Sequence, residues 1–408
     1  MIFGPKKLLK YFSILKRLEP PPVKRILIPE VKLKSGIIAQ TVSALSLISL
    51  ALLLVVGSGS LALAEKGWQA EWERVKAAAR KEGKVVVNIP PNPKLRKDLE
   101  KVMKEKFGLK LELLLARGSK SSRRIAAEHK AGVHYFDVAI LSPAQVVPRL
   151  RPIGAVLPLW PHLILPEVKD PKNWWGGHIF MDGGKKYNYA SAAYMLDNVW
   201  YNTNLVKEHE VTSWDDLLKP KFKGKIGLFD PRMGGAGRGI FGFIWEAKGE
   251  EYIKKLAAQK IVLGDRRPLA DQLAKGKLHI TIGPTYYTFR RFHKVGLPVA
   301  SFPKLKEGSY VSIGNGGPVM IANAPHPNAA KVFVNWLLSR EGQDLYTRAH
   351  VQATRRLDVD TKWTIKFGVR AAKDYITPKD FLTRENQSEK RNKSIRLPAL
   401  KFAKKLWD

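Results

Sequence analysis

The feature that most constrains the fold is a regular alternation of short apolar runs and amphipathic stretches in the first half of the chain. The runs Lys84–Asn88, Leu109–Leu115 and Phe136–Leu141 have the length and the branched aliphatic residues of buried strands. The stretches Leu95–Phe107 and Ser119–Ala131 have apolar residues at helical spacing, and a glycine follows each of them. This strand–helix order predicts a parallel sheet with right-handed crossovers.

The loops that follow the predicted strands are candidate ligand contacts. Ligands of such sheets bind beyond the carboxyl ends of the strands. Here those ends are the loops Ile89–Pro93, Ala116–Lys120 and Ser142–Ala144. Three polar residues in these loops are therefore candidate ligand-binding residues: Asn92, Ser119 and Lys120.

A second α/β series follows a connection that is rich in Pro and Trp. Tyr189–Tyr201 is strand-like, Lys225–Phe229 and Leu278–Gly283 are short strands, and a helix is expected to open at Gly239. The chain has 408 residues, of which 45% are hydrophobic, and this length exceeds what one hydrophobic core usually organises. Two lobes are therefore expected.

The first 64 residues have the features of a secretory signal peptide. A basic segment precedes the apolar stretch Thr41–Val56, and Ala62-Leu63-Ala64 has the small-residue pattern of a cleavage site. This predicts cleavage before Glu65 and a periplasmic mature protein. An uncleaved membrane anchor is the alternative, because Ile37–Ala64 is long enough to span a bilayer.

Composition narrows the function classes. The absence of cysteine excludes disulfides, thiolate metal sites, a cysteine nucleophile and a lipoprotein anchor. The formal net charge of +35 attracts anions at long range. No zinc-finger spacing or aromatic-interleaved basic run indicates nucleic-acid binding, so no nucleic acid is expected as a partner. A membrane-anchored basic protein that binds polyanions remains an alternative.

An enzyme on the same kind of fold is the other alternative, since fold alone does not determine function. However, the chain contains neither a G-x-S-x-G nucleophile elbow nor an H-E-x-x-H zinc motif. We therefore expect a binding protein with no catalytic residues and no required cofactor.

Motifs in the second half of the chain resemble a known family, the type 2 periplasmic binding proteins, in the branch that contains bacterial ferric-ion-binding proteins. The resemblance extends from about Trp68 to Arg348. The residues that carry it are Tyr201-Asn-Thr-Asn-Leu205, Thr212-Ser-Trp-Asp-Asp-Leu-Leu218, Phe222-Lys-Gly-Lys-Ile226, Asp230-Pro-Arg232, Ile282-Gly-Pro-Thr-Tyr-Tyr287, Ala324-Pro-His-Pro-Asn-Ala-Ala330 and Phe333-Val-Asn-Trp-Leu-Leu-Ser339.

The resemblance implies a two-lobed clamshell. Each lobe would be a mainly parallel sheet flanked by helices, and two or three hinge strands would join the lobes, which close around the ligand. The expected partners are a small-molecule or metal ligand and an ABC permease in the inner membrane, with the protein itself a monomer. The expected domains are lobe 1 (65–192 with 313–365), lobe 2 (193–312) and a C-terminal helical segment (366–408) packed on lobe 2.

Tyr286 and Tyr287 are the candidate metal ligands. The resemblance implies that two adjacent tyrosines at this place bind ferric iron through phenolate oxygens, and a hard cation favours oxygen donors. The alternatives are that the two rings pack in the protein or stack on an organic ligand. The histidine and glutamate that ferric members carry in the other lobe are missing here, where Ile89–Pro93 and the basic Arg117–Ser121 stand instead. Fe(III) is therefore expected, if at all, as a transported ligand together with an anion.

The glycine-rich segment Gly234–Arg238 is the candidate anion site. The resemblance places a synergistic anion here, and free N–H groups at a helix start attract anions. Arginine forks suit phosphate and carboxylate groups. The alternative is that the glycines only form a tight turn. The candidate residues are Gly235, Ala236, Gly237, Arg238 and Arg266. Together, these features predict an extracytoplasmic binding component of an ABC importer whose ligand is a small anion or ferric iron with an anion.

Overall fold

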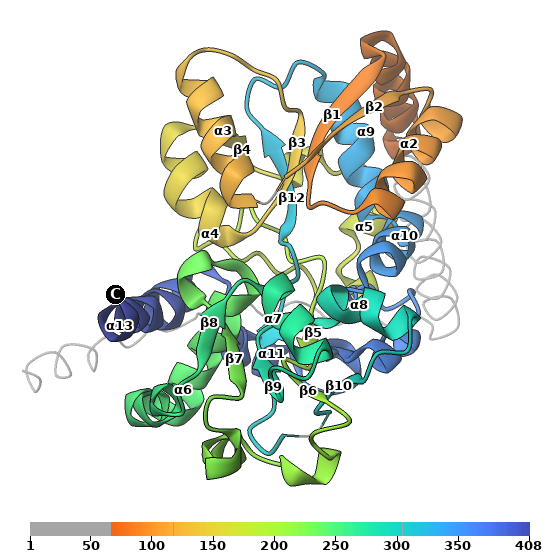
Figure 1. Cartoon of the computed structure of the whole chain (residues 1–408). Helices are drawn as coiled ribbons and strands as arrows, with labels where there is room; N and C mark the ends of the chain where they lie inside the picture. Colours follow the sequence, from red (N-terminus) through yellow and green to blue (C-terminus); the bar gives the residue numbers. More distant parts are fainter. Residues whose placement is uncertain (1–66, 117, 304) are drawn as a thin grey trace, which may run out of the picture. The chain divides into compact units, whose positions relative to one another are not determined.

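The computed structural model describes residues 67–116, 118–303 and 305–408. The predicted leader and its cleavage site lie outside this range, and the described residues belong to one compact unit. Within the described residues, helices are either too short or too polar to cross a bilayer. Figure 1 shows two groups of strands, each covered by helices on its faces.

The first sheet contains the predicted βαβαβ unit. A helix over residues 67–82 leads into the unit, which the structure confirms in order and in the parallel direction of its strands. The elements of the unit are β1 (Lys84–Ile89), α2 (Pro93–Phe107), β2 (Lys110–Leu115), α3 (Gly118–Lys130) and β3 (Val138–Leu141). The strand order is β2-β1-β3-β12-β4, completed by β4 (Val156–Leu157) and β12 (Gly317–Ile321).

The apolar residues of these elements form the core of the first lobe. Val85 and Val87 of β1 are buried with Leu95 and Leu99 of α2 in one cluster. The helix α9 (Pro327–Leu338) adds Phe333 to this cluster. A parallel strand buried on both faces requires a continuous apolar run, and this explains the pattern Lys84-Val-Val-Val-Asn88.

The second sheet has the order β10-β6-β9-β7-β8. Its strands are β6 (Val199–Asn202), β7 (Ile226–Phe229), β8 (Val262–Gly264), β9 (Ile280–Ile282) and β10 (Val299–Ser301). Strands β7, β8 and β9 are parallel and are each followed by a helix: α6 (Gly235–Ala258), α7 (Arg266–Ala274) and α8 (Tyr286–Lys294). The chain breaks from helical geometry once inside α6, at Gly249.

The strand-like stretch Tyr189–Tyr201 is not a single strand. It forms β5 (Tyr194–Leu196) and β6, with Asp197 and Asn198 between them. The Asp197 carboxylate pairs with Arg370 at 2.6 Å, and the Asp197 N–H donates to the carbonyl of Gly368. These contacts keep Asp197 out of the hydrogen-bond ladder of β6. No local pattern of the sequence predicts this break between the two strands.

A three-stranded antiparallel sheet, β11-β5-β13, joins the two groups. Strand β5 leads into the second sheet, and β11 (Val311–Ser312) returns the chain to β12 of the first. The third strand, β13 (Val369–Ala371), pairs with β5. Because β12 enters its sheet from the other lobe, it runs antiparallel to β3. Each of the two large sheets is consequently mixed, with two parallel and two antiparallel pairings among the described strands, rather than mainly parallel.

The chain after β13 crosses several earlier elements. It forms α11 (Pro378–Arg384), α12 (Glu389–Arg391), a π-helical turn (Asn392–Arg396) and α13 (Leu397–Trp407). Ala399 and Ala403 of α13 are fully buried in the same cluster as Phe241 of α6. Small residues on α13 therefore allow it to pack closely on the second lobe.

Candidate ligand-binding site

The predicted site residues lie where parallel strands end and helices begin. In the first lobe, α2 and α3 start directly after β1 and β2; in the second, α6, α7 and α8 start after β7, β8 and β9. The first backbone N–H groups of a helix have no partner within the helix and lie at its positive end. The predicted site residues lie at all five junctions, three in the second lobe and two in the first.

Tyr286 and Tyr287 occupy the first turn of α8, and their rings contact different neighbours. The Tyr286 ring packs at 4.4 Å from Phe367 and 5.7 Å from His293, between ring centroids. Burial raises the Tyr286 pKa, and the charge of Arg290 opposes this shift. Tyr287 is 39% exposed, and its hydroxyl donates to the Pro91 carbonyl at 3.2 Å.

The Tyr287 contact brings the start of α8 next to the loop after β1. This loop belongs to the first lobe, so the two strand ends that the sequence singles out lie beside each other. Within the described part of the chain, no group of three or more His, Asp or Glu residues is placed to hold a metal ion. Any cation at the tyrosines would therefore need oxygen donors from a bound anion or water.

The first-lobe candidates differ in their surroundings. Asn92 is buried and caps α2: its Oδ1 accepts from the Leu95 N–H at 3.1 Å, and its Nδ2 donates to the Ala349 carbonyl at 2.8 Å. Both polar atoms of the Asn92 amide are therefore bonded within the protein, where they hold α2 against α10 (Arg340–His350). Ser119 and Lys120 are exposed in the first turn of α3 and are accessible to a ligand.

The glycine-rich segment is part of α6 and does not precede it. The helix begins at Gly235, four residues before the expected start, and Gly234 and Gly235 have φ angles of +83° and +60°. Glycine adopts such angles without the cost that other residues incur. No side chain caps this helix start.

Gly237 allows α6 to pack closely against the end of β7. A Cβ atom at this position would lie 2.9 Å from both Cγ and the carbonyl oxygen of Phe229. Ala236 is half-buried and packs against the cluster that contains Phe229. These two residues therefore position the helix start. Only their backbone N–H groups are suited to contact a ligand.

The arginines near this helix start have different partners. The Arg232 guanidinium bonds the Asp230 carboxylate and reaches Asp408 at 2.6 Å, which raises the Arg232 pKa. Arg238 is half-buried, and its Nε is a buried donor without a hydrogen-bond partner. Burial lowers the Arg238 pKa. Arg266 is half-buried at the first residue of α7.

Pro91 and Arg396 also contact these helix starts, although neither is among the site residues predicted from the sequence. Arg396 donates to the Gly235 carbonyl at 3.0 Å, although it belongs to the C-terminal segment. No local pattern could have indicated this contact, because the two residues are far apart in the chain and Arg396 stands in an ordinary amphipathic stretch.

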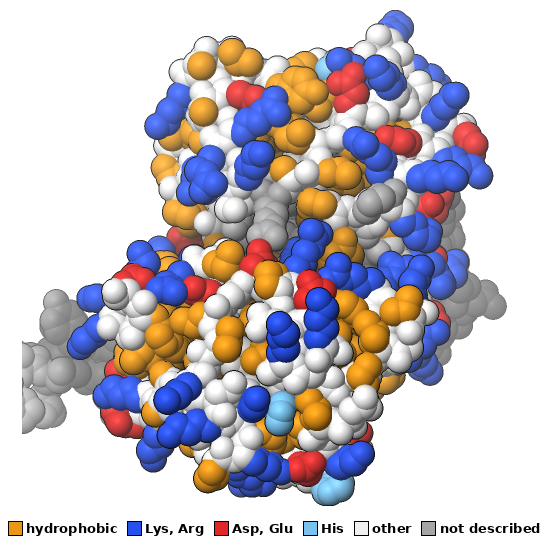
Figure 2. Space-filling model, in the orientation of Figure 1, with side chains coloured by type: hydrophobic (Ala, Val, Ile, Leu, Met, Phe, Trp, Pro, Cys, Tyr) orange, Lys and Arg blue, Asp and Glu red, His pale blue; other side chains and the backbone are white. Residues whose placement is uncertain are grey.

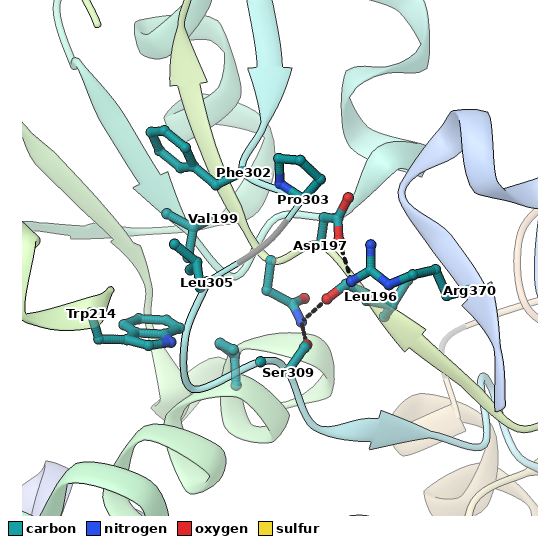
Figure 3. Close-up of a pocket in the computed structure, with 12 residues that line it drawn as sticks. Leu196, Asp197, Val199, Trp214, Phe302, Pro303, Leu305, Ser309 and Arg370 are labelled. Atoms are coloured by element: carbon teal, nitrogen blue, oxygen red, sulfur yellow. Dashed lines mark hydrogen bonds and ion pairs between the residues drawn. The ribbon is translucent and has the colours of Figure 1, made fainter. Parts of the chain in front are cut away.

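A small pocket lies between β5 and the chain after β10 (Figure 3). In it, Asn198 donates to the Leu196 carbonyl and to the Ser309 hydroxyl, and Asp197 pairs with Arg370. Burial raises the Asp197 pKa, and the Arg370 charge opposes this. These polar groups therefore bond one another at the turn between β5 and β6.

Comparison with solved structures shows the same fold. The iron- and citrate-bound IdiA (FutA) of Trichodesmium superposes with a TM-score of 0.59 at 18% identity, over 80% of this chain and 99% of that one. The ferric binding protein of Campylobacter jejuni gives 0.60 at 17%, over 79% and 99%. AfuA of Actinobacillus pleuropneumoniae, with fructose-6-phosphate bound, gives 0.55 at 19%, over 79% and 99%.

These likenesses confirm the expected two-lobed fold. No curated protein sequence matches the chain. The family model for the bacterial extracellular solute-binding protein matches residues 79–351, about two-thirds of the chain. The protein therefore belongs to the bacterial extracellular solute-binding protein family.

Proposed function

We propose that this protein is the periplasmic binding component of an ABC importer and that its ligand is a small oxyanion. The observation that carries the proposal is Arg238, a half-buried guanidinium with an unpartnered Nε beside the uncapped start of α6. A buried cation without a counter-charge is costly, and an oxyanion would supply both the charge and the missing acceptor. The exposed Ser119 and Lys120, and Arg266, would complete the site.

The surface charge supports an anionic ligand. Basic side chains are spread over both lobes on the face seen in Figure 2, with fewer acidic ones between them. A positive field concentrates anions near the protein and raises their rate of association. The bound ligands that appear in the descriptions of two similar structures, citrate with iron and fructose-6-phosphate, are also anions.

Lobe closure would deliver the ligand. We propose lobe limits at 65–192 with 313–365 and at 193–312, with residues 366–408 as a C-terminal segment on lobe 2. Strands β5 and β11, the antiparallel pair in which the chain crosses between the sheets, lie at these limits. Closure about these two strands would present both lobes to a permease. A binding role of this kind requires no catalytic residues.

The test is to identify what the protein carries. Native mass spectrometry and metal analysis of the mature protein, purified from its host without added ligand, should reveal an anionic small molecule. Calorimetry with that molecule should give weaker binding for Arg238→Gln and for Lys120→Ala. A neutral or cationic ligand, or unchanged affinity in both variants, would contradict the proposal.

Ferric iron held by Tyr286 and Tyr287 with an anion is the second candidate. It is favoured by the position of both tyrosines at the start of α8 and by the iron-binding proteins among the similar structures. Titration with ferric citrate should then give a visible phenolate charge-transfer band that Tyr286→Phe and Tyr287→Phe abolish. Tyr375→Phe, at a 49% exposed tyrosine in the C-terminal segment, is the matched control. A colourless wild-type protein would refute iron binding through phenolates.

A further inference from the structure

The second sheet carries lysines at one of its two ends. Strands β7, β8 and β9 are parallel, β6 runs antiparallel to β9, and β10 runs antiparallel to β6. The starts of β7, β8, β9 and β10 and the end of β6 therefore lie together, at the end of the sheet opposite to the starts of α6, α7 and α8. Within five residues of each of these strand ends, the chain has an exposed lysine. These lysines form the distal face: Lys207, Lys223, Lys225, Lys260, Lys275, Lys277 and Lys294.

The charge of the distal face is not neutralised by ion pairs. Among the residues that the structure describes, none of its seven lysines pairs with a carboxylate. Two acidic groups close to them in the chain have other partners: Glu210 pairs with Lys221, and Asp271 pairs with Arg291 at 2.5 Å. The exposed Glu208 offsets only one of the charges. The distal face is therefore strongly basic.

Helix ends account for some of these lysines but not for all of them. Lys260, Lys275 and Lys294 lie at or just after the last turns of α6, α7 and α8, where the negative end of a helix favours a cation. The other four stand outside these last turns, next to β6, β7 and β9. A preference of lysine for helix ends therefore does not explain the basic face as a whole.

Exposed apolar side chains lie among the lysines. They are Val295 (71% exposed), Leu205 (43%) and Leu297 (39%). The turns that carry them are joined, because the Thr203 N–H donates to the Pro298 carbonyl at 3.0 Å. A Cβ at Gly276, between the two lysines that precede β9, would lie 3.4 Å from the Leu205 Cδ1. Contact of apolar side chains with water is unfavourable, so this patch would gain free energy by entering a less polar phase.

We infer that the distal face binds membrane surfaces rich in anionic lipids, with its lysines at the headgroups and Val295, Leu205 and Leu297 in the interface. Each lysine near an anionic bilayer strengthens binding about fivefold, and apolar side chains beside basic ones are typical of segments that lie in this interface. Lysine is a point charge on a flexible stem and suits a layer of many headgroups, whereas arginine forks suit the single carboxylates of a protein partner.

The position of the distal face leaves the ligand site free. The candidate ligand residues of this lobe lie at the starts of α6, α7 and α8, at the other end of the sheet. The inference therefore goes beyond the proposed function: it adds a membrane surface as a partner, and it does not depend on which ligand the protein carries.

The test is co-sedimentation of the mature chain with lipid vesicles. At about 100 mM salt, wild type should bind vesicles with about 30% phosphatidylglycerol but not vesicles of phosphatidylcholine alone, and about 500 mM salt should release it. Replacing Lys275, Lys277 and Lys294 together by Gln should weaken binding about 100-fold, at about fivefold per lysine. If this triple variant does not fold, the three single variants, each weaker by about fivefold, provide the same comparison.

The matched control removes the same charge from exposed lysines of the first lobe. Replacing Lys97, Lys104 and Lys130 together by Gln should change binding less than about threefold, because salt screens charges that are far from the bilayer. For the apolar patch, Val295→Ser should weaken binding about threefold, whereas Val133→Ser, at a 54% exposed valine of the first lobe, should leave it unchanged.

A second readout reports on contact with the bilayer itself. Because the chain contains no cysteine, Val295→Cys and Val133→Cys each carry a single polarity-sensitive dye. Anionic vesicles should shift the dye emission to the blue at position 295 and leave it unchanged at position 133.

No wild-type binding to anionic vesicles, or an unshifted dye at position 295, would overturn the inference. Equal losses in the distal-face and first-lobe lysine variants would also overturn it, because binding would then reflect net charge alone. Binding to soluble polyglutamate without binding to vesicles would assign the face to an acidic protein instead of a membrane.

Discussion

Glu389 connects the C-terminal segment to the first lobe, and its replacement tests whether this segment is part of the folded unit. Its carboxylate accepts two hydrogen bonds from Arg151, at 3.0 and 3.1 Å, and one from Gly183 N at 2.8 Å. The side chain is 12% exposed. The bonds from Arg151 contribute most to lowering the Glu389 pKa, from 4.5 to about 2.

The magnitude follows from this pKa difference. Because the folded pKa lies below the unfolded one, the stabilisation is complete above pH 4.5 and is lost as the pH falls through 2. At about 1.4 kcal/mol per pKa unit, it amounts to about 3 kcal/mol at pH 7 and to about 1 kcal/mol at pH 3. Glu389→Gln should therefore lower the free energy of unfolding by about 3 kcal/mol at pH 7, and by clearly less at pH 3.

Urea denaturation of wild type and Glu389→Gln at pH 7, 5 and 3, followed by tryptophan fluorescence, measures the difference. Lys393→Gln is the control: Lys393 pairs with the same carboxylate at 3.1 Å, but it is 69% exposed and should cost less than about 0.5 kcal/mol. A difference between wild type and Glu389→Gln that stays constant from pH 7 to pH 3 would refute the electrostatic origin. A difference below about 0.5 kcal/mol at pH 7 would show that the Arg151 contact does not hold the segment.

Three further predictions concern other parts of the chain. Gly237→Ala should destabilise the protein by about 1–3 kcal/mol in thermal or urea unfolding, because its Cβ would overlap Phe229, whereas Gly184→Ala, with its nearest atom at 3.6 Å, should be nearly neutral. Burial lowers the His350 pKa to about 4, so the stability that the neutral imidazole contributes is present above pH 6.5 and is lost as the pH falls towards 4. Wild type therefore loses stability between pH 7 and 5, and His350→Gln should remove about 2 kcal/mol of this loss. His209→Gln, at an exposed histidine, should leave the loss unchanged. N-terminal sequencing of the exported protein should begin at Glu65, and a full-length chain that resists alkaline extraction from membranes would indicate an anchor instead.

Much of the fold could be predicted because the signals involved are local. The order β1-α2-β2-α3-β3 follows from apolar spacing within single segments, since a helix and a buried strand differ in period over a few residues. The positions of the tyrosine pair and of the glycine-rich segment at strand ends follow from the same patterns combined with the strand-end rule.

Contacts between distant segments decided the rest. The division of Tyr189–Tyr201 into β5 and β6 depends on Arg370 and Gly368, and the role of Asn92 as a cap that also holds α10 depends on the Ala349 carbonyl. Arg396 contacts the start of α6 only because α13 and the turn before it fold back onto this helix. Sequence patterns report the preferences of neighbouring residues, whereas the packing of side chains on distant segments determines which buried charges meet and which of them still need a partner.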